Sequence, residues 1–524
     1  MPNTDFLEGP NRSSRPDRLH WLSDRNEIST FLISFALLGL VLLPIWFADR
    51  YHLEDWRRLL DGSFGWSGEG RPFTELLMRV LNLGNPLMDL SPLPQIGAIA
   101  LLSYNAVLIS RKFSIKPPLV AALAAFPIGG SPFFLENLSF RFDSLGMAFS
   151  MLLALIPILT TNKLSAKAWI IGTCCIFLSL GFYQTGINAF FVFLIVELSL
   201  LQLEYAPLKK LFYLILFRLT AFSTGFLSYL LVSRTLVRGF YNQQHFAFVT
   251  KLSEIGIVGH NWNTAWHFIY ESFPNSQREI FLLPVRFSVI LLVGIGLFYL
   301  RFLIRSNQNK VLVVLVLIAV LLLPVGWIAG SLGPIIFPVN AIITLPRIYL
   351  GIGALLASSF VLICVALCKS GLDTKWLSLP LAIPAYTMIM FALVFGNALK
   401  EQKYYEDRVA TQLSDDIQQI TGTKSVDHVI MNGNISYAPP IRQAMRRYRI
   451  LRSLVSIDFR TDRDDGAYIH NKLRYYGLNK PPEDSDDSRS AIISKTEDSV
   501  PLRITAYYRL YVVDHYLIIA FTEI

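Results

Sequence analysis

Residues 48–92 read ADRYHLEDWRRLLDGSFGWSGEGRPFTELLMRVLNLGNPLMDLSP, a hydrophilic stretch that follows the first long apolar run of the chain. It combines an acidic pair, several arginines, two tryptophans and a short amphipathic segment. A segment that only connects two membrane spans does not need this much chemistry. We therefore expect a functional loop here, and we interpret the rest of the chain around it.

The composition is that of a membrane protein. The 524 residues are 53% hydrophobic and only 16% charged, whereas soluble domains are roughly 25% charged. Apolar runs of about 20 residues, the length that crosses a bilayer core, recur throughout residues 28–399. The net charge of +9 does not indicate nucleic-acid binding, because most basic residues of these runs flank them and set orientation instead.

The apolar runs predict a polytopic α-helical protein with about eleven transmembrane helices. Arginines 12, 15, 18 and 25 place the tail 1–27 in the cytoplasm by the positive-inside rule. The third run is short enough to be re-entrant. The expected spans are about 28–47, 93–110, 118–128, 144–159, two within 168–201, 211–232, 280–302, 311–328, 343–367 and 377–399. This topology puts the loop 48–92 and the C-terminus outside.

Residues 400–524 differ in kind and predict a small α+β domain on the extracytoplasmic side. The opening segment EQKYYEDRVATQLSDDIQQITG has the spacing of a helix. VDHVIMNG and TAYYRLYVVDHYLIIAF are rich in β-branched and aromatic residues and predict strands. LNKPPEDSDDSRS has the composition of a loop.

Within the first loop, residues 72–83 predict an amphipathic helix. Pro72 stands at its start and Gly84 just past its end, which is the usual asymmetry. One face is apolar and the other polar, so the helix is expected to lie in the membrane interface. Simple packing on the helical bundle is an equal alternative.

Glu54 and Asp55 are the candidates for catalysis, because they come shortly after the first span, where acidic residues are costly unless they are hydrated or paired. A carboxylate there can act as general base and take the proton of an attacking sugar hydroxyl. Adjacent side chains point in different directions, so we expect one of the two to serve. The alternative is ordinary ion pairing with Arg57 and Arg58.

The next outer loop, ENLSFRFD, contributes Glu136, Arg141 and Asp143. If it folds over the first loop, Arg141 can offset a phosphate charge with its planar fork, and Asp143 can orient a hydroxyl. An ion pair between Arg141 and Asp143 is the competing interpretation.

Two further polar residues stand at outer ends of expected spans. Gln184, in YQTG, is placed to hydrogen-bond a sugar, and Arg347, in LPRIYL, is placed for a lipid phosphate. An arginine in such a position is also a common interfacial anchor. The histidines show no metal-ligand spacing, and the chain has no glycine-rich nucleotide loop. That absence fits chemistry with a donor carried by lipid.

Several motifs resemble the type II glucosyl transferase family that modifies bacterial O-antigens. They are the acidic residues before Trp56, then GRPFTELLMRVLN, DLSPLPQ, ENLSFRFDS and SLGFYQTGINAFF. The resemblance covers about the first 200 residues best. It implies a GT-C-type membrane glycosyltransferase with an acidic residue in its first outer loop. By position it carries over to Glu54, Asp55, Arg71, Arg141, Asp143 and Gln184; HLEDW has Glu where a second Asp is expected, which leaves the identity of the base open.

The resemblance further implies transfer of glucose from undecaprenyl-phosphate glucose to O-antigen or a related surface glycan, on the periplasmic side of the bacterial inner membrane. We expect inversion at the anomeric carbon, with the phosphate near Arg71, Arg141 or Arg347. No cofactor is expected, and a divalent metal requirement stays open. The alternatives are a flippase for lipid-linked sugars, for which the nearest intramembrane ionisable residues are Glu197 and Arg218, and a non-catalytic subunit of an envelope assembly.

Overall fold

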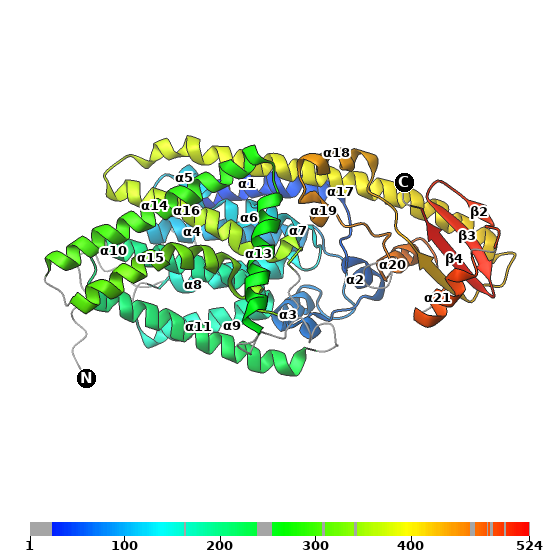
Figure 1. The fold of residues 1–524 in the computed structure, drawn as a ribbon, viewed down its shortest axis with the longest axis horizontal. Coiled ribbons are helices and arrows are strands. Elements are labelled where there is room, and N and C mark those ends of the chain that lie inside the picture. Colours follow the sequence, from blue (N-terminus) through cyan, green and yellow to red (C-terminus); the bar gives the residue numbers. More distant parts are fainter. Residues whose placement is uncertain are drawn as a thin grey trace.

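A computed structural model of the chain describes residues 24–161, 164–237, 254–306, 310–339, 343–461, 467–478, 480–482, 486–496 and 499–522. A bundle of helices forms one end of the molecule and a small sheet domain forms the other (Figure 1). The helices α2 and α20 lie between them. Most of the predicted cytoplasmic tail, residues 1–23, lies outside the described residues.

The bundle contains long helices and several short ones. Its helices are α1 (Arg25–Ala48), α4 (Leu93–Phe113), α5 (Pro118–Ala125), α6 (Pro127–Gly130), α7 (Leu135–Ser139), α8 (Ser144–Leu159), α9 (Ala166–Phe182), α10 (Asn188–Leu203), α11 (Leu208–Leu236), α13 (Ile255–Glu271), α14 (Asn275–Arg305), α15 (Lys310–Leu332), α16 (Leu350–Lys369) and α17 (Ser378–Thr421). Short 3₁₀ turns connect them: η3 (Pro132–Phe134), η4 (Gln184–Ile187), η6 (Gly333–Ile336), η7 (Pro346–Ile348) and η8 (Thr374–Leu377). The first loop contains α2 (Asp55–Asp61), η2 (Trp66–Glu69) and α3 (Pro72–Leu81).

Each predicted span coincides with helix in the structure. Among the described residues, seven helices are long and apolar enough to cross a membrane, or eight if the pair 118–130 and 132–139, bent by 47°, is one span. Three further apolar helical segments are shorter, namely α8, α9 and the part Val316–Leu332 of α15. The largely helical architecture is therefore as predicted, and the count of eleven spans stays a prediction.

Two boundaries differ from the prediction. The span expected from residue 343 begins only at Leu350, because Pro346 opens the turn η7, and proline is poorly tolerated inside a helix. The expected boundary at residue 400 falls inside α17, which runs for 44 residues without a break. Such a helix is about 66 Å long, so it leaves the bundle and enters the C-terminal domain as one rod.

The predicted interfacial helix forms as α3 and ends at Leu81. Phe73 packs edge-on against Phe177 of α9 at 5.3 Å, and Thr74 donates a hydrogen bond to the carbonyl of Phe182. The large apolar side chains of Leu76 and Val80, four residues apart on the helix, are exposed, as are Leu83 and Met88 in the segment that follows it. The helix thus docks on the bundle and also presents an apolar face that suits a membrane interface.

The C-terminal domain is an α+β unit, as expected. Its strands β1 (His428–Asn432), β2 (Arg503–Ile504), β3 (Tyr508–Val513) and β4 (Tyr516–Phe521) form a sheet in the order β1-β4-β3-β2, with β1 parallel to β4. Alternate residues face two separate cores, which is the period of a strand. The end of α17 covers one face together with α20 (Ala467–Tyr475). The remaining helices are α18 (Pro439–Arg447), α19 (Leu451–Leu454) and α21 (Asp486–Ser494).

The segment predicted as a loop, LNKPPEDSDDSRS, is only partly irregular. Its last residues begin the helix α21 at Asp486, so that part of the prediction is wrong. Ile492 of this helix packs in the small core formed with Ile430, Tyr511 and Ile518. Burial of that apolar side chain favours helix over the polar local composition.

Candidate active site

The acidic pair stands at the start of α2, close to where the first and second loops meet. Oδ2 of Asp55 accepts hydrogen bonds from the backbone amide of His52 at 3.2 Å and from that of Arg141 at 3.1 Å. The side chain is fully buried, and its Oδ1 has no hydrogen-bond partner. Buried carboxylate oxygens normally accept a hydrogen bond from the protein. Oδ1 of Asp55 does not, so it can accept one from a bound ligand.

The environments of the two carboxylates push their pKa values apart. Burial raises the pKa of Asp55 well above its ordinary value, and the negative charge of Asp143 raises it further. Burial also works to raise the pKa of Glu54, but Arg347 and Arg58 outweigh it, so that pKa lies below its ordinary value. Paired groups with divergent pKa values are a common sign of acid–base chemistry.

Asp143 is the centre of a cluster of cations and a tryptophan. Its Oδ1 accepts hydrogen bonds from Nε1 of Trp66 at 2.7 Å and from Arg71 at 3.3 Å, and Arg58 lies 3.4 Å from Oδ2. Both arginines also approach Glu69, at 3.6 and 3.4 Å. Arg58 is buried, whereas the side chain of Arg71 is 21% exposed and so is the accessible cation of this cluster.

Arg347 joins Glu54 to the second loop. Its guanidinium lies 3.0 Å from the buried Glu136 and 3.9 Å from Glu54, and its backbone amide also donates to Glu136 at 2.9 Å. Nε2 of His52 lies 3.5 Å from the carboxylate of Glu136. Glu54 is 30% exposed. Its partner is therefore an arginine far away in the sequence, and no ion pair between Glu54 or Asp55 and Arg57 or Arg58 is present within 4.0 Å among the described residues.

Arg141 and Asp143 do not pair with each other, contrary to the competing interpretation above. The guanidinium of Arg141 binds Asp89 at 2.6 Å and also Asp49, and it stacks over the ring of Tyr51 at 4.2 Å. Its side chain is only 11% exposed. Arg71 and Arg347 also face two carboxylates each, but their side chains are more exposed, at 21% and 16%, so they are the more accessible cations for a phosphate.

The side-chain amide of Gln184 forms hydrogen bonds with other groups of the protein in this structure. Its Nε2 donates to the carbonyl of Gly70 at 3.1 Å and to the hydroxyl of Tyr229 at 2.8 Å. Tyr229 donates to the same carbonyl at 3.0 Å. Since Gly70 precedes Arg71, these contacts fix the backbone that carries Arg71.

The structure thus brings the seven predicted residues into one connected region, but through partners that the sequence did not indicate. Arg58 was considered only as an ion-pair partner, and Trp66, Glu69 and His52 had no assigned role. The feature of the sequence that points to these residues is the concentration of charged and aromatic side chains in the first loop. Within the described ranges, no group of three His, Cys, Asp or Glu side chains is arranged to hold a metal ion.

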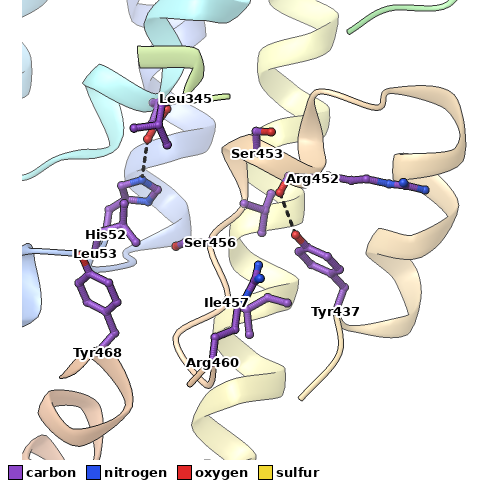
Figure 2. A pocket seen from close by; sticks show the side chains of 12 residues that line it. His52, Leu53, Leu345, Tyr437, Arg452, Ser453, Ser456, Ile457, Arg460 and Tyr468 are labelled. Atoms are coloured by element: carbon purple, nitrogen blue, oxygen red, sulfur yellow. Dashed lines mark hydrogen bonds and ion pairs between the residues drawn. The ribbon is translucent and has the colours of Figure 1, made fainter. Parts of the chain in front are cut away.

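A narrow polar cavity of about 20 Å³ lies where this region meets the C-terminal domain. Figure 2 shows Tyr468 beside His52 and Leu53, and Tyr437 on the opposite side with its hydroxyl on the carbonyl of Arg452, at 2.8 Å. A cavity of this size holds about one water molecule. In this conformation the cavity is therefore too small to bind a sugar.

A larger cavity of about 370 Å³ lies among α13, α14, α15 and α16, next to the second loop. Its lining is almost wholly apolar and includes Phe133, Phe273, Phe281 and Leu356. Phe133 also contacts the ring of Tyr349 at 5.7 Å, two residues after Arg347. The cavity therefore begins close to the Arg347–Glu136 pair.

Comparisons with known proteins identify the family of the chain. The chain is 24% identical over 438 residues to an uncharacterized 55.3 kDa protein in the gtrB 5′ region of Salmonella phage P22, covering 83% of this chain and 87% of the relative. No solved structure matches. The family model described as "Glucosyl transferase GtrII" matches residues 43–363, more than half of the chain, which include both loops and Arg347. As the first-loop motifs predict, the chain belongs to the glucosyl transferase GtrII family.

Proposed function

We propose that this protein transfers a glucosyl residue from undecaprenyl-phosphate glucose to O-antigen or a related surface glycan, at the periplasmic face of the bacterial inner membrane. The observation that carries the proposal is Asp55, a buried carboxylate of raised pKa with an unpartnered oxygen in the first loop. It lies in a region that the glucosyl transferase family covers. A general base needs this combination of basicity and free acceptor capacity.

The apolar cavity supports a lipid-linked donor. An isoprenoid chain between α13, α14 and α16 would bury apolar surface without leaving polar groups unpaired. Its phosphate would then lie near Arg347, with Arg71 as the second accessible cation. Arginine suits this task because its planar fork matches phosphate oxygens.

The proposed reaction is a single displacement. The acceptor hydroxyl gives its proton to Oδ1 of Asp55 as its oxygen forms a bond to the anomeric carbon. The bond between that carbon and the phosphate oxygen breaks, and the electron pair leaves on the lipid phosphate, whose charge the arginines stabilise. Without a covalent intermediate the anomeric configuration inverts. Glu54 keeps Arg347 in place and stays ionised.

The transporter alternative receives little support. Glu197 and Arg218, the ionisable residues named for it, pair with each other at 2.9 Å, and Lys112 joins Glu197 at 2.8 Å. A buried cluster in which one carboxylate binds two cations is suited to holding α4, α10 and α11 together. It does not resemble a set of charges poised for a moving substrate.

The test is the composition of the surface polysaccharide in cells that carry wild-type protein, Asp55→Asn, Glu54→Gln or the control Asp61→Asn. Asp61 lies on the same helix but pairs at the surface with Arg474. We expect loss of one hexose with Asp55→Asn at normal protein level, a smaller effect with Glu54→Gln and none with Asp61→Asn. Unchanged glycan in all variants, or no added hexose with the wild type, would overturn the proposal.

A further inference from the structure

A second hollow, distinct from the cavity of Figure 2 and polar in its lining, adjoins the turn that carries Glu54 and Asp55. It measures about 170 Å³ and is built jointly by the first loop, by the middle of α17 and by the C-terminal end of α20. We call it the junction cleft. It is lined by Asp49, Arg50, Tyr51, Trp56, Lys403, Asp407, Lys472, Tyr475 and Tyr476. Sites that bind small ligands commonly occur at such junctions between structural units.

Aromatic rings form a continuous wall of the junction cleft. Tyr51 lies 5.0 Å from Trp56, Trp56 lies 5.5 Å from Tyr475, and Tyr475 lies 5.4 Å from Tyr476. Tyr475 is 53% exposed although it is backed by the buried Trp56. The two rings meet edge to face, with an interplanar angle of 65°, and an exposed ring anchored in this way can stack against the apolar face of a ring-shaped ligand.

The charged groups of the junction cleft are each paired within the protein, which argues against a phosphate or another ion as its ligand. Arg50 and Lys472 are buried and paired with Glu406 and Asp458, at 3.0 to 3.4 Å. The accessible groups are Asp49, 65% exposed, together with the partly exposed Lys403 and Asp407. These acceptors and donors suit the hydroxyl groups of a neutral ligand.

The junction cleft is also rigidly attached to the candidate active site. Nε1 of Trp56 donates to Asp458 at 3.2 Å, and Lys472 lies over the Trp56 ring at 5.4 Å. Trp56 directly follows Asp55, and Tyr51 lies beneath the guanidinium of Arg141, whose backbone amide holds Asp55. A ligand in the cleft is therefore held beside the same turn that carries the proposed base.

We propose that the junction cleft binds a neutral pyranose unit of the acceptor glycan, a unit that neighbours the one to be modified. The apolar face of the ring would stack on Tyr475, and its hydroxyl groups would bind Asp49 and Asp407. The nature of this ligand rests on the proposed function. The placement of the cleft rests on the contacts described above.

The experiment uses the full-length enzyme in lipid nanodiscs, with O-polysaccharide released from the lipopolysaccharide of the expressing strain as acceptor. Tyr475→Ala is compared with Tyr475→Phe, which keeps the ring, and with Tyr404→Ala, which removes an equally exposed aromatic side chain outside the cleft. We expect Tyr475→Ala to raise the KM for the polysaccharide about tenfold, at unchanged kcat and unchanged KM for the lipid donor. Tyr475→Phe should restore the KM, and Tyr404→Ala should match the wild type.

Binding is measured separately by saturation-transfer NMR on the Asp55→Asn enzyme, which keeps the cleft and lacks the proposed base. If the wild type transfers hexose but Tyr475→Ala changes neither the KM for the polysaccharide nor its binding, the proposed role of the cleft is wrong. The proposed function then still stands. Binding that depends on Tyr475, in an enzyme that transfers no hexose, supports the cleft and overturns the proposed function. The two inferences can thus fail independently.

Discussion

The backbone amide of Arg141 donates a hydrogen bond to Oδ2 of Asp55, so the second loop of the bundle holds a carboxylate of the first. An amide cannot neutralise a charge in the way that a guanidinium does. The bond therefore orients Asp55 without fully offsetting the cost of ionising it among buried groups. Several consequences of this arrangement can be measured.

Asp55→Asn should stabilise the protein at neutral and higher pH while it abolishes transfer. The amide oxygen can accept the two backbone hydrogen bonds, and no buried charge has to form. A carboxyl whose pKa is raised in the folded state loses stability as pH rises through that pKa. The variant should thus melt a few degrees above the wild type at pH 8, with the gap closing at acidic pH. If the melting temperatures of the wild type and the variant differ by the same amount at every pH, the raised pKa assigned to Asp55 is wrong.

The rate of transfer should report the same pKa. As a general base, Asp55 works only when deprotonated, so kcat/KM should fall as pH drops through its raised pKa. The acid limb should therefore lie above the pH at which an ordinary aspartate titrates, about 3.9. Steady-state kinetics from pH 4 to 9 check this, with Asp61→Asn as the control that keeps the profile. An acid limb in the ordinary range would point away from Asp55.

Arg347→Gln should cost about 3–5 kcal/mol of stability, because it leaves Glu136 buried without its cation. Adding Glu136→Gln should recover much of that loss, since the uncompensated charge is then gone. Transfer should stay defective in the double variant if Arg347 binds the donor phosphate. Thermal unfolding and donor KM, measured on both single variants and the double variant, separate the two effects. Recovery of activity together with stability would assign Arg347 a purely structural role.

Gln184→Ala should have a mild effect on its own, about 1 kcal/mol, because Tyr229 still donates to the carbonyl of Gly70. Combining it with Tyr229→Phe removes both donors and leaves that carbonyl unsatisfied. The double variant should lose more than the sum of the single variants and should raise the KM for the donor, since Arg71 follows Gly70. Strictly additive losses would show that these donors do not act on one backbone segment.

Lys472→Met should loosen the C-terminal domain. Lys472 is buried between Glu406 and Asp458, so its loss leaves carboxylates unpaired at a cost of about 3–5 kcal/mol. Lys495→Met is the control, because the pair of Lys495 with Asp514 is exposed to solvent and such surface pairs contribute little to stability. Limited proteolysis between the two units should accelerate only in Lys472→Met.

The same cluster predicts acid sensitivity. Burial works to raise the pKa of Asp458, but Arg50 and Lys472 outweigh it and lower the pKa to about 2. The stability that this lowered pKa represents is present above about pH 4 and is lost as pH falls from there toward 2. Release of the C-terminal domain in that interval, followed by proteolysis, is the expected result. An attachment that is insensitive to acid would contradict it.

The features predictable from the sequence were those that depend on neighbouring residues. Long apolar runs became helices of the bundle, and the alternating segments 428–432 and 508–521 became strands. The first loop was recognisable because its charges and tryptophans are concentrated in one hydrophilic interval. Local patterns of this kind reflect local physical preferences.

Pairings between residues that are distant in the chain could not be predicted from the sequence. Arg141 is next but one to Asp143, yet it binds Asp49 and Asp89, which the fold brings from the first loop. Glu54 finds its arginine at position 347 for the same reason. The continuity of α17 was also hidden, because hydropathy falls at residue 400 while helix propensity does not. Lys472 likewise meets its partners Glu406 and Asp458 only in the folded chain.

The contacts of Arg50 and Trp56 with Glu406, Asp458 and Lys472 have a consequence for engineering and for the divergence of related enzymes. The family model covers Arg50 and Trp56 and ends at residue 363, before the other three residues of the junction. A chimaera that exchanges residues 400–522 alone would set a foreign surface against buried charges and fold poorly. Exchange of residues 49–61 along with them would preserve the charge pairing, so the two segments are best transferred together between homologues.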